Sequence, residues 1–427
     1  MPRRPYDECV AAAANSDYIH TGTRLFWRVN LAMVAAAFCT FALIYCVQPL
    51  LPVLAAEFHV SPAVSSLALS LTTGVLALGM VAAGLISETI DRKSLMGWSM
   101  VASAALSLAS AFSPNWHMLL ATRALAGLAL SGVPAVAMAY ISEEIAPDSG
   151  GLAMGVYVGG TAMGGMSGRL LAGVLCDLFS WRGAVAIIGG LGLLAGVLFW
   201  LLLPRSRHFV RRSAHPAELA ATIRAHWSDS GLRWMFLMGF LLMGSFVSTY
   251  NYLQFRLVAP PYGLTQSHVG LLFGVYVIGM LSSAWAGRMA GRRGPGAVVW
   301  RMLVIMLMGL GVTLARPLGM IVLGTAVVTF GFFGAHAVVS GWVGGRARIA
   351  RAIAASLYLF AYYLGSSLVG TFAGFFWAFG RWRGVAAAVG TLLLIGWLVS
   401  LRLSRLEPPE RAARELSEGQ KAVPGIA

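Results

Sequence analysis

Long apolar runs dominate the sequence, and short polar or turn-forming segments separate each run from the next. A run of roughly 20 apolar residues is long enough to cross a lipid bilayer as an α-helix. The pattern therefore predicts an all-α integral membrane protein with twelve transmembrane helices. The predicted spans are 29–56, 63–87, 94–113, 116–141, 151–176, 183–203, 233–259, 267–288, 297–315, 318–343, 352–379 and 383–403.

Composition supports a membrane protein and excludes other classes. Hydrophobic residues make up 58% of the 427 residues and charged residues only 11%, whereas soluble domains carry about 25% charged residues. Such a chain lacks the polar surface that covers a soluble core, and it is too apolar to be disordered. The 4 cysteines have no metal-site spacing, so we expect no disulfide framework, no metal and no cofactor.

The longest connection between predicted spans is polar and basic, and it divides the chain into two groups of six spans. We therefore predict five parts: a tail at 1–28, a first six-helix half at 29–203, a linker at 204–232, a second half at 233–403 and a tail at 404–427.

Basic residues are distributed unequally between the two predicted sides of the membrane. With a cytoplasmic N-terminus, 24 of the 31 Lys and Arg residues fall in cytoplasmic segments and 4 fall in outer loops. Positively charged loops remain on the cytoplasmic side, so both termini are predicted to be cytoplasmic. The other 3 basic residues, Arg123, Arg169 and Arg256, lie inside spans and are not explained by this rule.

The two halves resemble each other at an offset of about 200 residues. Gly79-Met80 recurs as Gly279-Met280, and Trp181-Arg182-Gly183 recurs as Trp382-Arg383-Gly384. Repeats of this kind are typical of transporters, in which a site near the bilayer midplane lies between the halves and is exposed to each side in turn. The repeat therefore predicts a transporter that works by alternating access.

The segment after the second span resembles the loop motif of the major facilitator superfamily: Gly, a hydrophobe two positions on, then Asp, Arg, Gly, Arg and Lys. Glu88 stands for the Asp, and Thr89 and Asp91 replace an Arg and a Gly. The resemblance implies a gate, in which an acid at a helix end pairs with basic groups in one conformation. A plain positively charged inner loop is the alternative. The matching residues are Gly84, Ile86, Arg92 and Lys93.

The fourth span contains Arg123-Ala-Leu-Ala-Gly127, which is similar to the superfamily's Arg-x-x-x-Gly motif. That motif is linked to proton transfer in drug antiporters, so the resemblance implies a role for Arg123 in coupling. A charge inside a span costs roughly 2.5–3.5 kcal/mol, and such an arginine must face a cavity or a polar partner. The alternative is an arginine that extends to the outer surface.

The fifth span is rich in glycine around Gly164 and Gly165, and it resembles the antiporter motif of twelve-span drug/proton antiporters. Thr161 stands where that branch has Pro. Helix packing alone is the alternative, because small residues let helices approach closely. The Pro-interrupted first span, Tyr45–Pro52, also resembles this branch. Together the motifs imply a monomeric multidrug or metabolite efflux antiporter of the bacterial inner membrane, with protons and lipid as partners and no nucleic acid.

Polar residues inside the spans are the candidates for substrate contact. For each of them, packing or a helix-to-helix hydrogen bond is the alternative role, and Arg256 is expected to extend toward the membrane surface. The candidates are Tyr45, Gln48, Arg123, Tyr157, Arg169, Tyr250, Asn251, Gln254 and His336.

The 16 acidic residues lie outside the middle of every predicted span. Arg123 and Arg169 therefore favour neutral, zwitterionic or anionic substrates over cations. The proton carrier would be His336 or a carboxylate at a span end, because an imidazole titrates near neutral pH. The hypothesis is proton-coupled efflux of small molecules. The alternative is a transporter of an organic anion, a sugar or a siderophore, in either direction.

Enzymatic and ATP-driven classes have no support in the motifs. The chain lacks His-Glu-x-x-His, Gly-x-Ser-x-Gly and a phosphate-binding Gly-Lys-Ser/Thr loop, which are signatures of metalloproteases, α/β-hydrolases and nucleotide-driven pumps. We therefore expect a protein that is not an enzyme. A receptor or scaffold would leave the internal repeat and the gate-like loop unexplained.

Overall fold

The computed structural model describes residues 18–209, 211 and 216–405. These residues form helices joined by short turns, with one isolated β-bridge between Ile19 and Ile145 and no strand among them. The all-α fold is therefore confirmed. Predictions about residues 1–17 and 406–427, including the basic residues there, fall outside the described residues.

The helices follow the predicted spans closely. Up to residue 202 they are α2 (Arg24–Tyr45), η1 (Gln48–Leu50), α3 (Leu51–Glu57), α4 (Pro62–Ser65), α5 (Leu67–Ile86), α6 (Arg92–Ala111), α7 (Trp116–Leu130), α8 (Gly132–Glu144), α9 (Pro147–Leu178) and α10 (Trp181–Leu202). After the linker they are α11 (Pro216–Ser228), α12 (Ser230–Val258), α13 (Gln266–Leu271), η2 (Leu272–Val275), α14 (Tyr276–Arg293), α15 (Pro295–Val312), α16 (Leu318–Arg346) and α17 (Arg351–Ser404).

Ten helical segments among the described residues are long and apolar enough to cross a membrane. One of them, α17, has 54 residues and contains both of the last two predicted spans. Non-helical torsion angles at Arg381 mark the boundary between these two spans. The 32-residue helix α9 corresponds to the fifth predicted span. The helical segments thus account for the twelve predicted spans.

Helix starts are set by side chains that accept a hydrogen bond from a backbone N–H of the first turn. Such a cap satisfies one of the N–H groups that have no partner inside the helix. Local sequence chemistry therefore explains six of the helix starts. The capping residues are Thr23, Ser61, Asp91, Asn115, Ser180 and Asp229.

Contacts divide the chain into two units. Unit 1 comprises the described residues of 1–59, 71–214 and 265–271, and unit 2 comprises those of 60–70, 215–264 and 272–427. Within unit 1, α13 packs on α9, and within unit 2, α4 packs on α17. The division into halves at 29–203 and 233–403 stays a prediction about domains.

Each unit is built around one closely packed pair of helices, α2 with α9 in unit 1 and α12 with α17 in unit 2. A Cβ atom on Gly164 would lie 2.5 Å from the Cα of Phe38, and one on Gly365 would lie 2.8 Å from the Cα of Phe240. Neither glycine can be replaced without moving a backbone. These equivalent contacts show the internal repeat in three dimensions.

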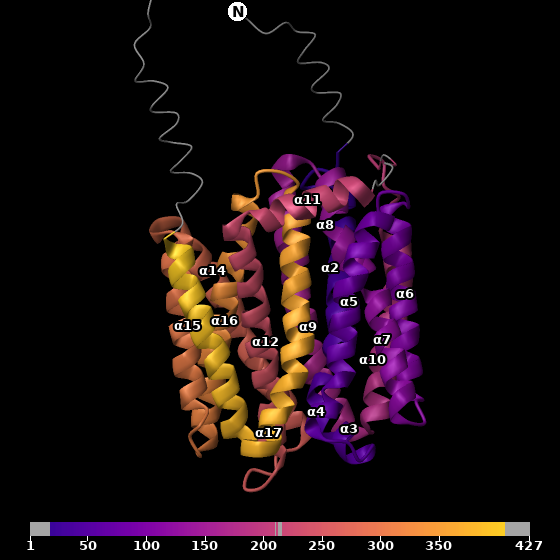
Figure 1. Cartoon of the computed structure of the whole chain (residues 1–427). Coiled ribbons are helices and arrows are strands. Elements are labelled where there is room, and N and C mark those ends of the chain that lie inside the picture. The colour runs from indigo at the N-terminus through magenta and orange to yellow at the C-terminus, as the bar shows by residue number, and fades with distance from the viewer. Residues whose placement is uncertain (1–17, 210, 212–215, 406–427) are drawn as a thin grey trace, which may run out of the picture. The chain divides into compact units, whose positions relative to one another are not determined.

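The linker contains a helix that the sequence pattern did not predict. Helix α11 lies across the end of α12 (Figure 1) and packs on α12 and α17 within unit 2. Trp227 of α11 stacks near Phe236 of α12, with 6.5 Å between ring centroids. The polar and basic character of the linker predicts a simple connection, but the linker also contains Leu219, Ile223 and Trp227, whose spacing of four suits one face of a helix.

Candidate substrate-binding and gating sites

The break in the first span creates a polar site inside unit 1. Pro49 and Pro52 have no N–H to continue the helix, and α2 ends at Tyr45. The Arg123 guanidinium donates from Nη2 to the carbonyl oxygens of Leu43 and Ile44, at 3.2 and 3.0 Å. A cation at a helix C-terminus is favoured by the helix dipole. Arg123 is 0% exposed, so it does not extend to the outer surface.

Arg169 of α9 lies against the same broken segment. Its Nε donates to Oε1 of Gln48 at 2.6 Å, and its Nη1 donates to the Gly165 carbonyl at 2.6 Å. The guanidinium carbon lies 3.9 Å from the centroid of the Tyr45 ring, which is a cation–π contact. Arg169 is 2% exposed. The structure therefore brings together four predicted site residues, the unit 1 cluster of Tyr45, Gln48, Arg123 and Arg169.

The unit 1 cluster concentrates positive charge in a buried place. The groups that hold the two guanidiniums include backbone carbonyls, an amide and an aromatic ring, which are neutral. Coulomb interactions are stronger in such surroundings than in water, so the cluster attracts an anionic or strongly dipolar molecule. Tyr157 is also buried, but it precedes Arg169 by twelve residues on α9, about 18 Å along a helix.

Unit 2 contains a different cluster, made of aromatic rings and hydroxyl groups. His336 Nδ1 and the Tyr358 hydroxyl are 2.9 Å apart, and the Tyr362 ring centroid is 4.7 Å from that of His336. The Tyr250 hydroxyl and Thr329 Oγ1 are 2.7 Å apart. We call Tyr250, Thr329, His336, Tyr358 and Tyr362 the unit 2 cluster.

A stack of rings joins the two ends of the unit 2 cluster. Phe246 lies 4.9 Å from Tyr250 and 3.8 Å from Phe332, and Phe332 stacks on His336 at 5.9 Å. Phe246, Phe332 and Thr329 were missed by sequence reasoning, because an apolar ring or a threonine in an apolar helix carries no distinguishing signal. Asn251 and Gln254 are buried in α12, and their contact with substrate stays a prediction.

The gate-like motif forms an ion-pair network at the predicted cytoplasmic end of unit 1. Nη2 of the buried Arg92 lies 2.8 Å from Glu143 Oε1 and 3.4 Å from Glu88 Oε1. Asp91 caps α6 by accepting from the Ser94 amide at 3.0 Å. Lys93 lies over the Trp200 ring at 5.6 Å. A Cβ atom on Gly84 would meet open space, so close packing does not explain that glycine.

A second network at this end involves Glu144, the residue after Glu143. Its carboxylate accepts from the Ser206 hydroxyl at 2.5 Å and from the amides of Arg207 and His208 at 2.7 and 2.9 Å. The Glu144 side chain is 2% exposed. These bonds attach the beginning of the linker to the end of α8, a contact that no local pattern indicates because 62 residues separate Glu144 from Ser206.

Unit 2 uses one ion pair at its corresponding end. Arg346 Nε donates to Asp229 Oδ1 at 2.7 Å, which ties the end of α16 to the start of α12. Burial opposes ionisation of Asp229, but hydrogen bonds from Arg346 and from backbone amides outweigh it and hold the pKa of this carboxyl below its usual value. Asp229 is therefore a carboxylate at neutral pH.

Arg256, at the other end of α12, is held by carbonyl groups. Its guanidinium donates to Thr313, to Ala315 at 2.6 Å and to the Tyr262 hydroxyl at 3.1 Å. These carbonyls follow the end of α15, where a cation is favoured. Arg256 thus ties α12 to the end of α15 within unit 2.

Paired long apolar helices with buried polar clusters define a multi-pass membrane protein. The profile of the Major Facilitator Superfamily matches residues 33–344. Over 395 residues the chain is 43% identical to the uncharacterized MFS-type transporter YybF of Bacillus subtilis (strain 168), covering 92% of this chain and 98% of the relative. Over 390 residues it is 47% identical to the inner membrane transport protein YnfM of Escherichia coli (strain K12), covering 91% and 94%. The chain therefore belongs to the major facilitator superfamily and is a membrane transporter.

Solved structures share the fold at low sequence identity. A bacterial homologue of the human lysosomal transporter Spinster, in an inward-facing conformation, gives a TM-score of 0.74 with 17% identity, over 90% of this chain and 98% of that chain. The human organic anion transporter MFSD10 gives 0.67 with 17% identity, over 88% and 99%. These similarities establish the major facilitator fold.

Proposed function

We propose that this transporter exports small drug-like or metabolite molecules across a bacterial inner membrane, by alternating access and in exchange for protons. The observation that carries the proposal is the unit 1 cluster, in which Arg169 is held by Gln48 and Tyr45. A buried guanidinium with an oriented amide and an aromatic ring is suited to bind a carboxylate or another polar group. The substrates are therefore anionic, zwitterionic or neutral.

Substrate exchange in proteoliposomes tests the role of Arg169. Purified protein is first screened by thermal shift against organic acids, zwitterionic antibiotics, siderophores and cationic dyes, and the best ligand is then used for counterflow. Arg169→Met should lower exchange about 100-fold, whereas Arg169→Lys should retain more of it because the charge remains. Arg301 is exposed and bonds only within its own helix among the described residues, so Arg301→Met is the matched control. Exchange at the wild-type rate in Arg169→Met would disprove the site.

Proton coupling is assigned to His336. The Tyr358 hydroxyl orients the imidazole, and protonation in one conformational state would link a proton to each transport cycle. Collapsing the proton gradient should stop concentrative transport and leave counterflow intact. His336→Gln should flatten the pH dependence of transport between about pH 5 and 8. Transport that continues uphill without the gradient would contradict coupling while leaving the substrate site in place.

A specific metabolite transporter is the second candidate. Thr161 occupies the position of the branch's proline and bonds to the Val158 carbonyl at 2.7 Å, as in an ordinary helix, which removes one feature of the antiporters. An organic anion, a sugar or a siderophore would then be carried in a direction set by its gradient. The ligand screen separates the candidates, because a multidrug exporter should respond to several unrelated compounds and a specific transporter to one.

The orientation is proposed from charge. The excess of basic residues in segments 204–233 and 288–301 favours both termini in the cytoplasm. A C-terminal fusion to a reporter that fluoresces only in the cytoplasm should be bright, and one to a phosphatase that is active only outside should be inactive. The opposite pair of results would reverse the topology.

A further inference from the structure

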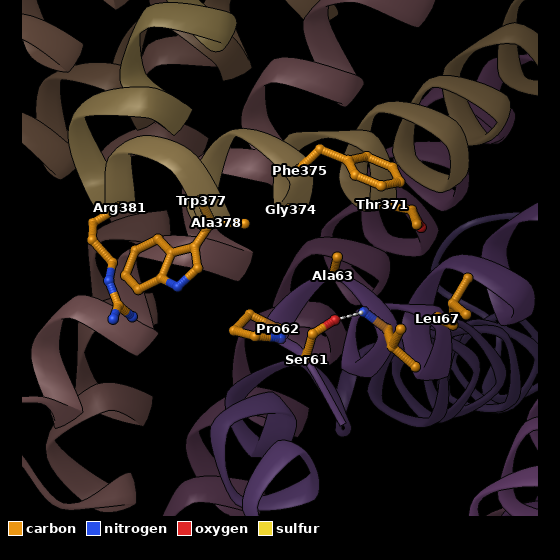
Figure 2. A pocket seen from close by; sticks show the side chains of 11 residues that line it. Ser61, Pro62, Ala63, Leu67, Thr371, Gly374, Phe375, Trp377, Ala378 and Arg381 are labelled. Carbon is orange, nitrogen blue, oxygen red and sulfur yellow. Dashed lines mark hydrogen bonds between the residues drawn. The ribbon is translucent and has the colours of Figure 1, made fainter. Parts of the chain in front are cut away.

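A pocket lies within unit 2 where the start of α4 meets the middle of α17. Figure 2 shows α4 residues on one side and α17 residues, with Arg381, on the other. Its volume is about 480 Å³, within the range of small-molecule sites. Apolar side chains form most of the wall: Pro62, Val64, Leu67, Phe375 and Trp377.

Arg381 occupies a backbone conformation that glycine would adopt more easily. Its φ is 49° and its ψ is −138°, at the kink that joins the two helical parts of α17. Strained residues of this kind are concentrated at functional sites. The turn brings the guanidinium to 6.0 Å from the Trp377 ring at the edge of the pocket. The position of this charge is therefore built into the helix break.

The charge of Arg381 has no internal counterpart. The sequence contains no Asp or Glu from 230 to 406, and Arg381 forms no ion pair with any residue that the structure describes. Arg256, in contrast, is held by helix-end carbonyls. An anion from outside the protein is the natural partner of Arg381.

The pocket adjoins exposed aromatic side chains of α17. Phe375, which lines it, is 56% exposed, and the nearby Phe372 and Phe379 are 60% and 92% exposed. Exposed apolar rings on a membrane-spanning helix are more stable in contact with lipid than with water. A molecule with an apolar chain can therefore enter the pocket from the membrane while its charged head remains beside Arg381.

We propose that this pocket binds an anionic phospholipid, with one acyl chain between α4 and α17 and the phosphate on the Arg381 guanidinium. Arginine is well suited to phosphate because its N–H groups match the phosphate oxygens. The pocket therefore suits any molecule with an anionic head group and a linear apolar chain. A free fatty acid has the same features, and a phospholipid is favoured because the exposed rings beside the pocket are most stable in contact with lipid.

Binding is measured with the full-length protein in detergent. Phosphatidylglycerol with brominated acyl chains is titrated in, and quenching of Trp377 is obtained as the difference between wild type and Trp377→Phe. Phosphatidylglycerol should quench and should raise the melting temperature, whereas phosphatidylcholine should do so much more weakly. Arg381→Gln should weaken the binding of phosphatidylglycerol about tenfold. Val64→Phe, which fills part of the pocket without adding a tryptophan, should reduce quenching.

Three further variants make the outcome decisive. Arg383 carries the same charge two residues further along the chain, but it does not line the pocket. Arg383→Gln should therefore bind phosphatidylglycerol like wild type. Arg381→Gly removes the guanidinium but suits the backbone, so it should be folded and should still lose binding. Thr371 Oγ1 is buried without a hydrogen-bond partner among the described residues. Because an acyl chain has no polar group to bind this hydroxyl, Thr371→Val should not weaken phospholipid binding.

Each contrary result overturns the assignment. Equal losses in Arg383→Gln and Arg381→Gln would show a general charge effect. Weaker binding by Thr371→Val would indicate a ligand that is polar at both ends. Quenching by brominated oleate, with none by phosphatidylglycerol, would assign the pocket to a free fatty acid. Transport is not part of the readout, so these results do not depend on the proposed function.

Discussion

The unit 1 cluster and the unit 2 cluster each lie beside the central helix pair of their unit but contain different chemistry. In unit 1, α2 holds the tyrosine, η1 the glutamine, and α7 and α9 one arginine each. In unit 2, α12, α16 and α17 hold tyrosines, a threonine and a histidine. Gly164 and Gly365, which pack the two pairs, are 201 residues apart, and the same offset relates Arg169 to Gly370. The position of the Arg169 side chain in unit 1 is thus occupied by a glycine, Gly370, in unit 2.

This difference shows which parts of the repeat are constrained. Packing glycines recur because any side chain there would meet a backbone. Cluster positions diverge because each needs only its own hydrogen-bond partners. At Gly370, for example, the carbonyl accepts from the Tyr252 hydroxyl at 2.9 Å. The two units therefore offer different chemistry, cationic in unit 1 and aromatic in unit 2.

The largest expected effect comes from filling the two glycine contacts. Gly164→Leu and Gly365→Leu should each prevent accumulation of folded protein, because the new side chain collides with Phe38 or Phe240. Folded yield is measured by size-exclusion chromatography of fluorescent fusions. Gly159 faces open space, and Gly159→Leu should fold normally. If only one unit is sensitive, the packing of the two pairs is not equivalent.

The next effect concerns Arg169, where the two units differ most. Arg169→Met should lower kcat/KM for exchange about 100-fold, which corresponds to about 3 kcal/mol for a buried charge contact. Tyr362→Phe in the unit 2 cluster removes one hydroxyl and should cost less than tenfold. A larger loss in Tyr362→Phe than in Arg169→Met would place the dominant substrate contact in unit 2.

Arg123 should affect stability more than selectivity. Arg123→Met leaves the carbonyls of Leu43 and Ile44 without their donor and should cost about 2 kcal/mol of folding stability. The melting temperature should fall by several degrees, while the ranking of substrates stays the same. A changed ranking with an unchanged melting temperature would assign Arg123 to the substrate site.

The ion pair at the start of α12 should give a smaller, pH-dependent effect. The pKa of Asp229 is lowered in the folded protein, so its stabilisation is present above about pH 4, the ordinary value. It is lost as the pH falls through the lower folded pKa. Because the pair is partly exposed, Asp229→Asn should cost less than about 1 kcal/mol at pH 7. Melting curves of wild type and Asp229→Asn should converge at low pH. A constant difference down to pH 3 would mean that the carboxylate charge contributes nothing.

Much of the fold could be predicted because the features that define a membrane helix lie within one short segment of sequence. Apolar length, capping residues such as Asn115 and the break at Pro49 are properties of short segments. The charged and polar residues of the unit 1 cluster could also be selected, since a charge in an apolar helix is costly. Thr329 and the ring stack of Phe246 and Phe332 could not, because their residue types are common in any apolar helix.

By itself, the sequence determined the twelve spans, the repeat and the identity of the buried arginines, because hydrophobic length and isolated charge are physical properties of consecutive residues. Only the tertiary structure decided the partners. Arg169 meets Gln48 across 121 residues of sequence, and Glu144 meets the linker across 62. The torsion angles that turn Arg381 toward its pocket are likewise known only from the structure. Such contacts depend on how helices pack side by side, which no local pattern of residues encodes.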